Sequence, residues 1–283
     1  MGRIQVLAPK SVMTLGIALG ERADRAAMWP GLGRREPGPV RLVIAPDEAA
    51  LGRVSRGRIP SWGVGLALPG ARTIVVRADA PDPYAALRHE LAHLALHDAL
   101  RVRVPLWFDE GYAVVAAGEW DRLDAFKLNW VVIRGAVGDL RTLDAALRQS
   151  EAEAATAYAL SGATVMHLAR LNPTGTLDPL MGRLARGEPF DSAVIATTGL
   201  TLSGFERSWQ RDLRRRFGAL VWLSAGGGWL VVALVVLGAA RWRRKRDLPR
   251  RRALDEGWVI PPEPEADGGV ETPPPDPVRP LSD

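Results

Sequence analysis

The stretch RHELAHLALH, residues 88–97, decides how the rest of the chain is interpreted. It contains three of the four histidines in the protein, and His89, Glu90 and His93 form a His-Glu-x-x-His motif. Leucines recur at helical spacing, which predicts a helix. Residues four apart on a helix differ by about 40° and 6 Å, so the two imidazoles can converge on one metal ion. Glu90 can then reach a water molecule on the same ion.

A plain amphipathic helix with a polar stripe is the alternative to a metal site. It explains the leucines, but it does not explain histidines at i, i+4 and i+8 in a chain with so few of them. His97 cannot complete the ligand set, because it lies about 12 Å from His89 along the helix axis. We expect His97 beside the site or on the surface, and a third ligand from another element.

The segment VPLWFDEGYAVVAAG, residues 104–118, provides a candidate third ligand. Pro105 ends a short loop, and a helix from about residue 107 to 118 would return antiparallel to the first. Glu110 near its start could then meet the two histidines. Alternatively, Asp109 and Glu110 complement the positive end of the helix dipole. Asp109 could also orient a ligand histidine.

The predicted fold class is α+β, with a small N-terminal sheet followed by a mainly helical body. Alternation and β-branched residues predict strands at residues 40–46 and 72–78, with a weaker one at 63–68. After Pro81 the apolar spacing is helical, over residues 84–100, 108–117, 122–134, 154–171 and 202–217.

Residues 219–240 contain no charge and are predicted to form one transmembrane helix. The alternatives are a buried core helix or a hairpin broken at the glycines of residues 226–228. The basic residues after it exceed those before it, which places the C-terminal tail in the cytoplasm and the large domain outside the cell inner membrane. Residues 241–283 combine a basic juxtamembrane segment with a disordered tail rich in proline and acidic residues. Residues 1–39 are interpreted as an N-terminal segment with a truncated or missing export signal.

The net charge of +5 gives no support to nucleic-acid binding. Eight basic residues and one acidic residue lie between Arg241 and Arg252, so this segment carries +7 and the remainder sums to −2. The main domain therefore has no overall basic character. The chain has no cysteine, which excludes disulfides, thiolate metal ligands and cysteine nucleophiles.

HELAH followed by WFDEGYA resembles the gluzincin metallopeptidases, and in particular the small bacterial peptidase MA-like domains, relatives of the aminopeptidase N and thermolysin catalytic cores. Sixteen residues separate His93 from Glu110, close to the spacing usual in that group. The resemblance covers about residues 40–217 and implies a zincin-type body. These two motifs carry most of its specificity.

The resemblance implies one Zn²⁺ per chain, held by His89, His93 and Glu110. It also implies that Glu90 is the general base acting on the zinc-bound water. A tyrosine from a later helix would stabilise the developing oxyanion, and Tyr158 lies in the corresponding helix; a packing role for Tyr158 is an equal alternative. The ligand set also suits Co²⁺ or Mn²⁺.

The resulting hypothesis is a membrane-anchored zinc endopeptidase acting on peptides or proteins. Residues 63–68 lack the carboxylate that grips the free amine of the substrate in related aminopeptidases, which favours an endopeptidase. One alternative is a non-catalytic scaffold or sensor of the same fold in the membrane, although such a protein has no need of Glu90. Another is a tail-anchored protease that faces the cytoplasm.

Overall fold

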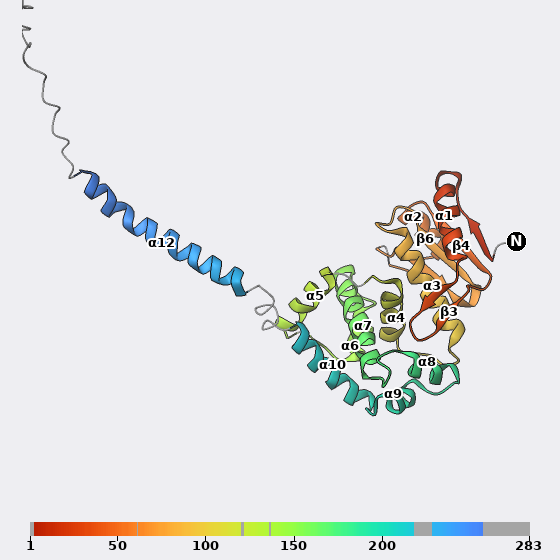
Figure 1. Cartoon of the computed structure of the whole chain (residues 1–283). Coiled ribbons are helices and arrows are strands. Elements are labelled where there is room, and N and C mark those ends of the chain that lie inside the picture. The colour runs from red at the N-terminus through yellow and green to blue at the C-terminus, as the bar shows by residue number, and fades with distance from the viewer. Residues whose placement is uncertain (1–2, 61, 120–121, 136, 218–227, 257–283) are drawn as a thin grey trace, which may run out of the picture. The chain divides into compact units, whose positions relative to one another are not determined.

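The computed structural model describes residues 3–60, 62–119, 122–135, 137–217 and 228–256. The chain divides into two units, Met1–Ala225 and Gly226–Asp283. The described part of the second unit is one helix, α12 (Gly228–Glu256). The first unit contains the sheet and the helical body (Figure 1). All the candidate site residues belong to it as well.

A four-stranded sheet occupies the N-terminal part of the first unit. Its strand order is β1 (Ile4–Leu7), β4 (Val40–Ala45), β6 (Thr73–Arg77), β5 (Gly65–Leu68). The first three strands are parallel, and Val43 lies opposite Val75. β5 runs antiparallel to β6 and forms an edge of the sheet. Among the described strands, β5 therefore has a partner on one side only.

Helices cover both faces of the sheet, which explains its nearly continuous apolar strands. α1 (Met13–Ala23) and α3 (Pro83–Ala99) share one core with Leu42 and Ile74, while α2 (Glu48–Ser55) packs on the opposite face. Asp82 caps α3 by accepting hydrogen bonds from the backbone N–H groups of Tyr84 and Ala85. The shorter elements around them are β2 (Ala27–Trp29), β3 (Gly33–Arg35), η1 (Lys10–Val12) and η2 (Pro69–Ala71).

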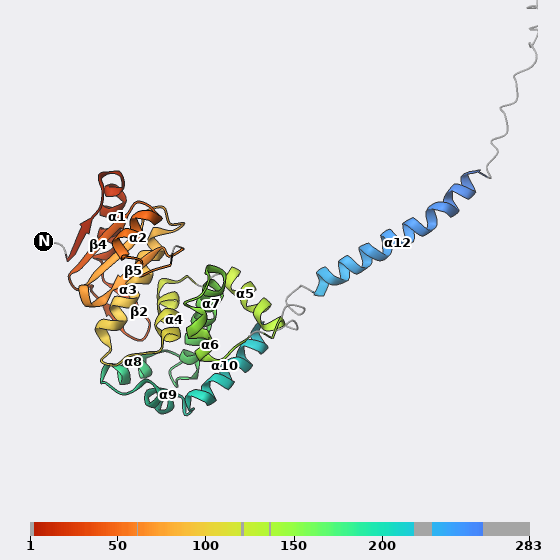
Figure 2. The same cartoon turned by 180° about the vertical axis from the view of Figure 1, so that it is seen from behind.

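The rest of the first unit is helical and contains the larger hydrophobic core. Figures 1 and 2 show α4 and α7 side by side in this body. The helices are α4 (Leu106–Ala117), α5 (Arg122–Ile133), α6 (Leu140–Ala146), α7 (Glu151–Leu171), α8 (Asp178–Ala185), α9 (Phe190–Thr198) and α10 (Leu202–Phe217). The small sheet and mainly helical body match the prediction.

Gly111 fixes how closely α4 approaches α7. A Cβ atom at this position would lie 2.3 Å from the backbone oxygen of Ser161, so no larger residue fits without moving one helix. The aromatic residues on either side, Trp107, Phe108 and Tyr112, are buried. The WFDEGYA segment thus anchors α4 in the core, and Asp109 and Glu110 are held facing α3.

The prediction of a transmembrane helix over residues 219–240 is wrong. Among the described helices, none is both long and apolar enough to cross a membrane. Residues 219–227 lie outside the described part of the chain, and α12 begins at Gly228. Its uncharged part, residues 228–240, spans about 20 Å, against about 30 Å for the hydrocarbon core. The localisation as a single-pass inner-membrane protein rested on that helix and is wrong with it.

Candidate metal centre

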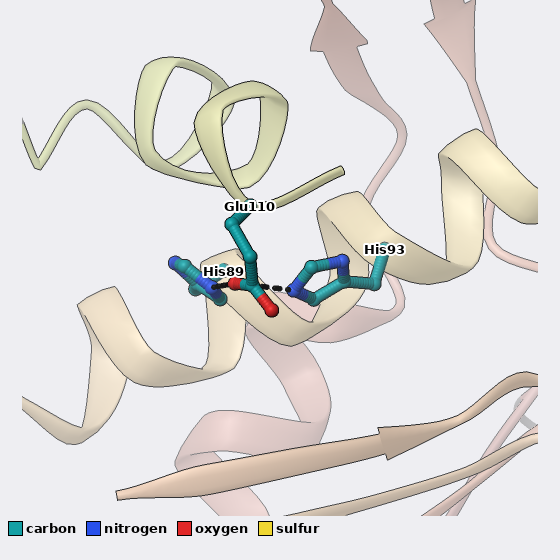
Figure 3. A group of neighbouring side chains, drawn as sticks. All are labelled: His89, His93 and Glu110. Carbon is teal, nitrogen blue, oxygen red and sulfur yellow. Dashed lines mark ion pairs between the residues drawn. The ribbon is translucent and has the colours of Figure 1, made fainter. Parts of the chain in front are cut away.

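His89, His93 and Glu110 converge between α3 and α4. One carboxylate oxygen of Glu110 lies 3.4 Å from Nε2 of His89 and 3.5 Å from Nε2 of His93 (Figure 3). One donor atom from each residue falls within 4.8 Å of the others. The two helices run antiparallel, as expected from the short connection, because Arg88 contacts Ala116 near the end of α4 while His97 contacts Asp109 near its start. Because α4 begins at Leu106, Glu110 stands beyond its first turn, where the helix dipole explains its presence less well.

A second layer of carboxylates holds the two imidazoles in place. Nδ1 of His93 hydrogen-bonds to Asp109 at 2.7 Å, and Nδ1 of His89 hydrogen-bonds to Glu119 at 3.0 Å. A neutral histidine that donates through Nδ1 presents the Nε2 lone pair to a metal. Both Nε2 atoms face Glu110, so the network leaves them oriented toward the common centre.

His97 lies beside the site. Its Nε2 hydrogen-bonds to the second oxygen of Asp109 at 2.8 Å, and its side chain is 45% exposed. His93, His97 and Asp109 thus form a second close group of donor atoms. In this group both Asp109 oxygens are engaged by imidazole nitrogens, so we interpret it as the support of His93.

The ionisable groups of the centre shift one another's pKa values. Burial alone would lower the pKa of His89, but its contacts with Glu110 and Glu119 outweigh that effect and raise the pKa to about 9. Burial opposes ionisation of Glu110, yet the two histidines hold its pKa at about 2. Protons on the imidazoles therefore balance the carboxylates in the metal-free protein. A divalent cation placed among the same atoms could replace those protons.

Glu90 is buried on the sheet side of α3, with its carboxylate against the edge strand β5. Its pKa is raised by burial, and a hydrogen bond from the backbone of Ala67 partly opposes the rise. Gly65 makes room for it, because a Cβ atom there would lie 2.7 Å from Oε1 of Glu90. Glu90 therefore lies beside the centre, but it does not belong to the group of close donor atoms formed by His89, His93 and Glu110.

Replacing Gly65 by alanine is expected to displace the Glu90 carboxylate. The added methyl group collides with Oε1, so the carboxylate has to move. If Glu90 acts as a general base in hydrolysis, a displacement of about 1 Å can cost up to about 100-fold in rate, and we then expect turnover to fall about 10- to 100-fold with metal content unchanged. Gly70→Ala is the matched control, because a Cβ atom there meets open space. Equal turnover in the two variants would contradict this packing of Glu90.

Tyr158 reaches the centre from α7. Its ring lies 6.2 Å from that of His89, edge to face, and 6.5 Å from the ring of Trp62. Burial and the nearby carboxylates Glu110 and Glu90 raise its pKa, so the hydroxyl stays protonated. Within the described part of the chain, this hydroxyl makes no hydrogen bond. It is thus available as a donor, whereas Tyr112 is fully buried in the core.

The three converging residues, together with Glu90 and Tyr158, line one cleft of about 1000 Å³. One wall is the edge strand with the loop before it, and the opposite wall comes from α4 and α7. Trp62, Leu66 and Arg148 lie around the predicted site residues in this cleft. The structure thus brings His89, Glu90, His93, Glu110 and Tyr158 together at one cavity.

Sequence reasoning missed Glu119 and Gly65. Glu119 follows α4, and its backbone N–H donates to the carbonyl of Val114, which fixes it near His89. An acidic residue at the negative end of a helix dipole is unfavourable unless a cationic group lies nearby, and this was the available signal. Gly65 gave no signal, because its importance depends on the approach of α3 to β5.

The fold and the site together define an α+β domain with a candidate metal centre between two antiparallel helices. The sequence profile of the Peptidase MA superfamily matches residues 33–215, more than half of the chain. The chain therefore belongs to the Peptidase MA superfamily, whose members are typically zinc-dependent. No curated protein matches the sequence. Membership supports peptidase activity at the level of the superfamily.

Proposed function

We propose that this protein is a zinc-dependent endopeptidase, with His89, His93 and Glu110 as the metal ligands. The convergence of both Nε2 atoms on one Glu110 oxygen, at 3.4 and 3.5 Å, carries the proposal. Two imidazoles and one carboxylate form a common ligand set of catalytic zinc sites, which keep one position open. The carboxylates behind the two histidines fit the same purpose, since they fix the orientation of each ring.

Zinc held by these residues would polarise the substrate carbonyl and lower the pKa of a bound water towards 7. The position of Glu90 beside the centre and its raised pKa support a role as general base. Its carboxylate accepts a proton from the attacking water and passes it to the nitrogen of the leaving amine. A pKa raised by burial suits this work, because the group must both gain and release a proton near neutral pH.

Tyr158 is proposed to donate a hydrogen bond from its hydroxyl to the developing oxyanion. Tyr158→Phe removes that donor and keeps the ring beside His89, so we expect turnover to fall about 100-fold with zinc content unchanged. Tyr84→Phe is the matched control, since Tyr84 is half-exposed and lies outside the cleft. Unchanged turnover in Tyr158→Phe would return this residue to a packing role.

The substrate is proposed to be an extended peptide that pairs with the free side of β5. This edge strand lines the cleft and offers backbone groups for β-augmentation. Its residues Gly65–Leu68 carry no carboxylate that could grip a free amine. We therefore expect cleavage at internal peptide bonds.

A blocked peptide tests the proposed function. A fluorogenic peptide library with acetylated N-termini and amidated C-termini should be cleaved by the zinc-loaded full chain. The same peptides with free termini should be cleaved no faster. Cleavage confined to free N-termini would contradict the endopeptidase assignment. A zinc-loaded chain that cleaves neither set would contradict the proposed function itself.

A further inference from the structure

A second cavity lies on the far side of α3 from the metal centre. Its volume is about 260 Å³, and no residue that lines it also lines the cleft. Leu87 and Leu91 form part of its wall, and each stands two residues from His89, about 200° around the helix. The same helix therefore presents one face to each cavity.

The floor of this second cavity is apolar. It lies where the two large cores meet, because Trp29 belongs to the core of the helical body and Val40 to that of the sheet. Leu91 packs against both cores and is only partly buried. Ala27 and Ala95 are also partly buried at this junction. Apolar surface is thus left exposed to the cavity, and an apolar group could cover it.

The rim of the cavity is basic. It carries two carboxylates and five arginines: Arg22, Arg25, Arg35, Arg72 and Arg88. Asp98 is paired with Arg72 at 2.8 Å, and Glu36 is paired with Arg3, which lies outside the cavity lining. The other four rim arginines form no salt bridge with a carboxylate of the described residues. The rim therefore holds positive charge that the described part of the protein does not neutralise by pairing.

Arg88 is held in place by three contacts. Its Nε donates to the backbone carbonyl of Ala116 at 2.7 Å, and its Nη2 donates to that of Met28 at 3.5 Å. Its Cζ atom lies over the ring of Trp29, 5.1 Å from the ring centroid. The Nη1 group has no hydrogen-bond partner among the described residues. A guanidinium held in advance loses little conformational entropy when it binds an oxyanion. Arg35 is similarly held, through a bond from its Nε to the carbonyl of Leu32.

We propose that this cavity binds a small organic anion with an apolar body. The oxyanion, a carboxylate or a phosphate, pairs with Arg35 and Arg88, and the apolar body covers Leu91 and the neighbouring floor. Guanidinium groups match both kinds of oxyanion through paired N–H donors. The cavity volume of about 260 Å³ is slightly below the usual range of ligand pockets, about 300–1000 Å³, which limits the ligand to a small molecule.

Calorimetric titration of the full chain with four probes tests the chemistry of the ligand. Octanoate and octyl phosphate combine an oxyanion with an apolar chain, octanol lacks the charge, and inorganic phosphate lacks the chain. Octanoate, octyl phosphate or both should bind at least about tenfold more tightly than octanol and inorganic phosphate. The ratio of the dissociation constants of octanoate and octyl phosphate identifies the preferred oxyanion. Equal binding of octanol, equal binding of inorganic phosphate, or no binding of any probe would overturn the proposal.

Variants locate the binding. Arg35→Gln should weaken binding about tenfold, because it removes a charge-assisted hydrogen bond. Arg34→Gln is the matched control, since Arg34 is the preceding residue on the same strand and does not line the cavity. His93→Ala should leave the binding unchanged, whereas an anion bound to a metal in the cleft would be lost. Binding that is lost in His93→Ala but kept in Arg35→Gln would overturn the proposal without affecting the proposed function.

Discussion

Glu90→Gln is expected to lower peptide hydrolysis by about 100- to 10,000-fold, the contribution of a positioned general base. The amide matches the carboxylate in shape, so it fits the space left by Gly65. It cannot accept the proton of the attacking water. Glu90 is outside the group of converging donor atoms, so zinc content should be unchanged. The measurement is turnover of the blocked peptide with zinc analysis of the same sample.

The matched control for Glu90→Gln is Glu48→Gln, at an exposed residue in the first turn of α2. It makes the same chemical change away from the cleft and should leave hydrolysis at the wild-type level. Hydrolysis retained in Glu90→Gln within a factor of a few would contradict the assignment of Glu90 as the base. Loss of zinc in this variant would instead give Glu90 a role in holding the metal.

Glu110→Ala is expected to weaken zinc binding by more than about 100-fold and to abolish hydrolysis as a consequence. Loss of a residue that only orients a ligand costs about 10- to 100-fold in metal affinity, and loss of a direct ligand should cost more. The variant also removes the carboxylate that faces both Nε2 atoms. Competition with a chromogenic chelator of known affinity measures the change.

Asp191→Ala controls for the alternative in which Glu110 only complements a helix dipole. Asp191 lies in the first turn of α9, so its loss removes a similar charge from a helix start outside the cleft. Zinc affinity should be unchanged in that variant. If Glu110→Ala also keeps wild-type zinc affinity, the third ligand lies elsewhere.

The elements nearest the site could be predicted from the sequence because their patterns are local. Helical spacing around HELAH gives α3, and the β-branched runs give β4 and β6. β1 and α1 were not predicted, although they complete the sheet and its cover. β1 has only four residues, too few for a clear alternating pattern. It forms a strand by pairing with β4, whose residues lie more than 30 positions further along the chain.

The convergence of His89 and His93 could also be predicted, because their spacing is a property of one helix. Glu110 needed one further step, the return of the chain after Pro105. The carboxylate that hydrogen-bonds to His89 from behind could not be predicted in the same way. The contact of Glu119 with His89 joins residues 30 positions apart, and it depends on how α3 and α4 pack.

The incorrect transmembrane prediction has a simple physical origin. The prediction rests on the length of one uncharged run of 22 residues, because such a run is long enough to span a membrane only if it is helical throughout. Residues 219–227 of this run lie outside the described part of the chain. The described helix covers only residues 228–240 of the run, and no described helix is long and apolar enough to cross a membrane.

Removal and restoration of zinc tests the central claim most directly. The full chain is stripped of metal with a chelator, freed of the chelator, and assayed on the blocked peptide before and after addition of one equivalent of zinc. Hydrolysis should disappear with the metal and return when one zinc per chain is bound. Hydrolysis that persists without metal, or a chain that binds one zinc and cleaves nothing, would contradict the assignment as a zinc peptidase.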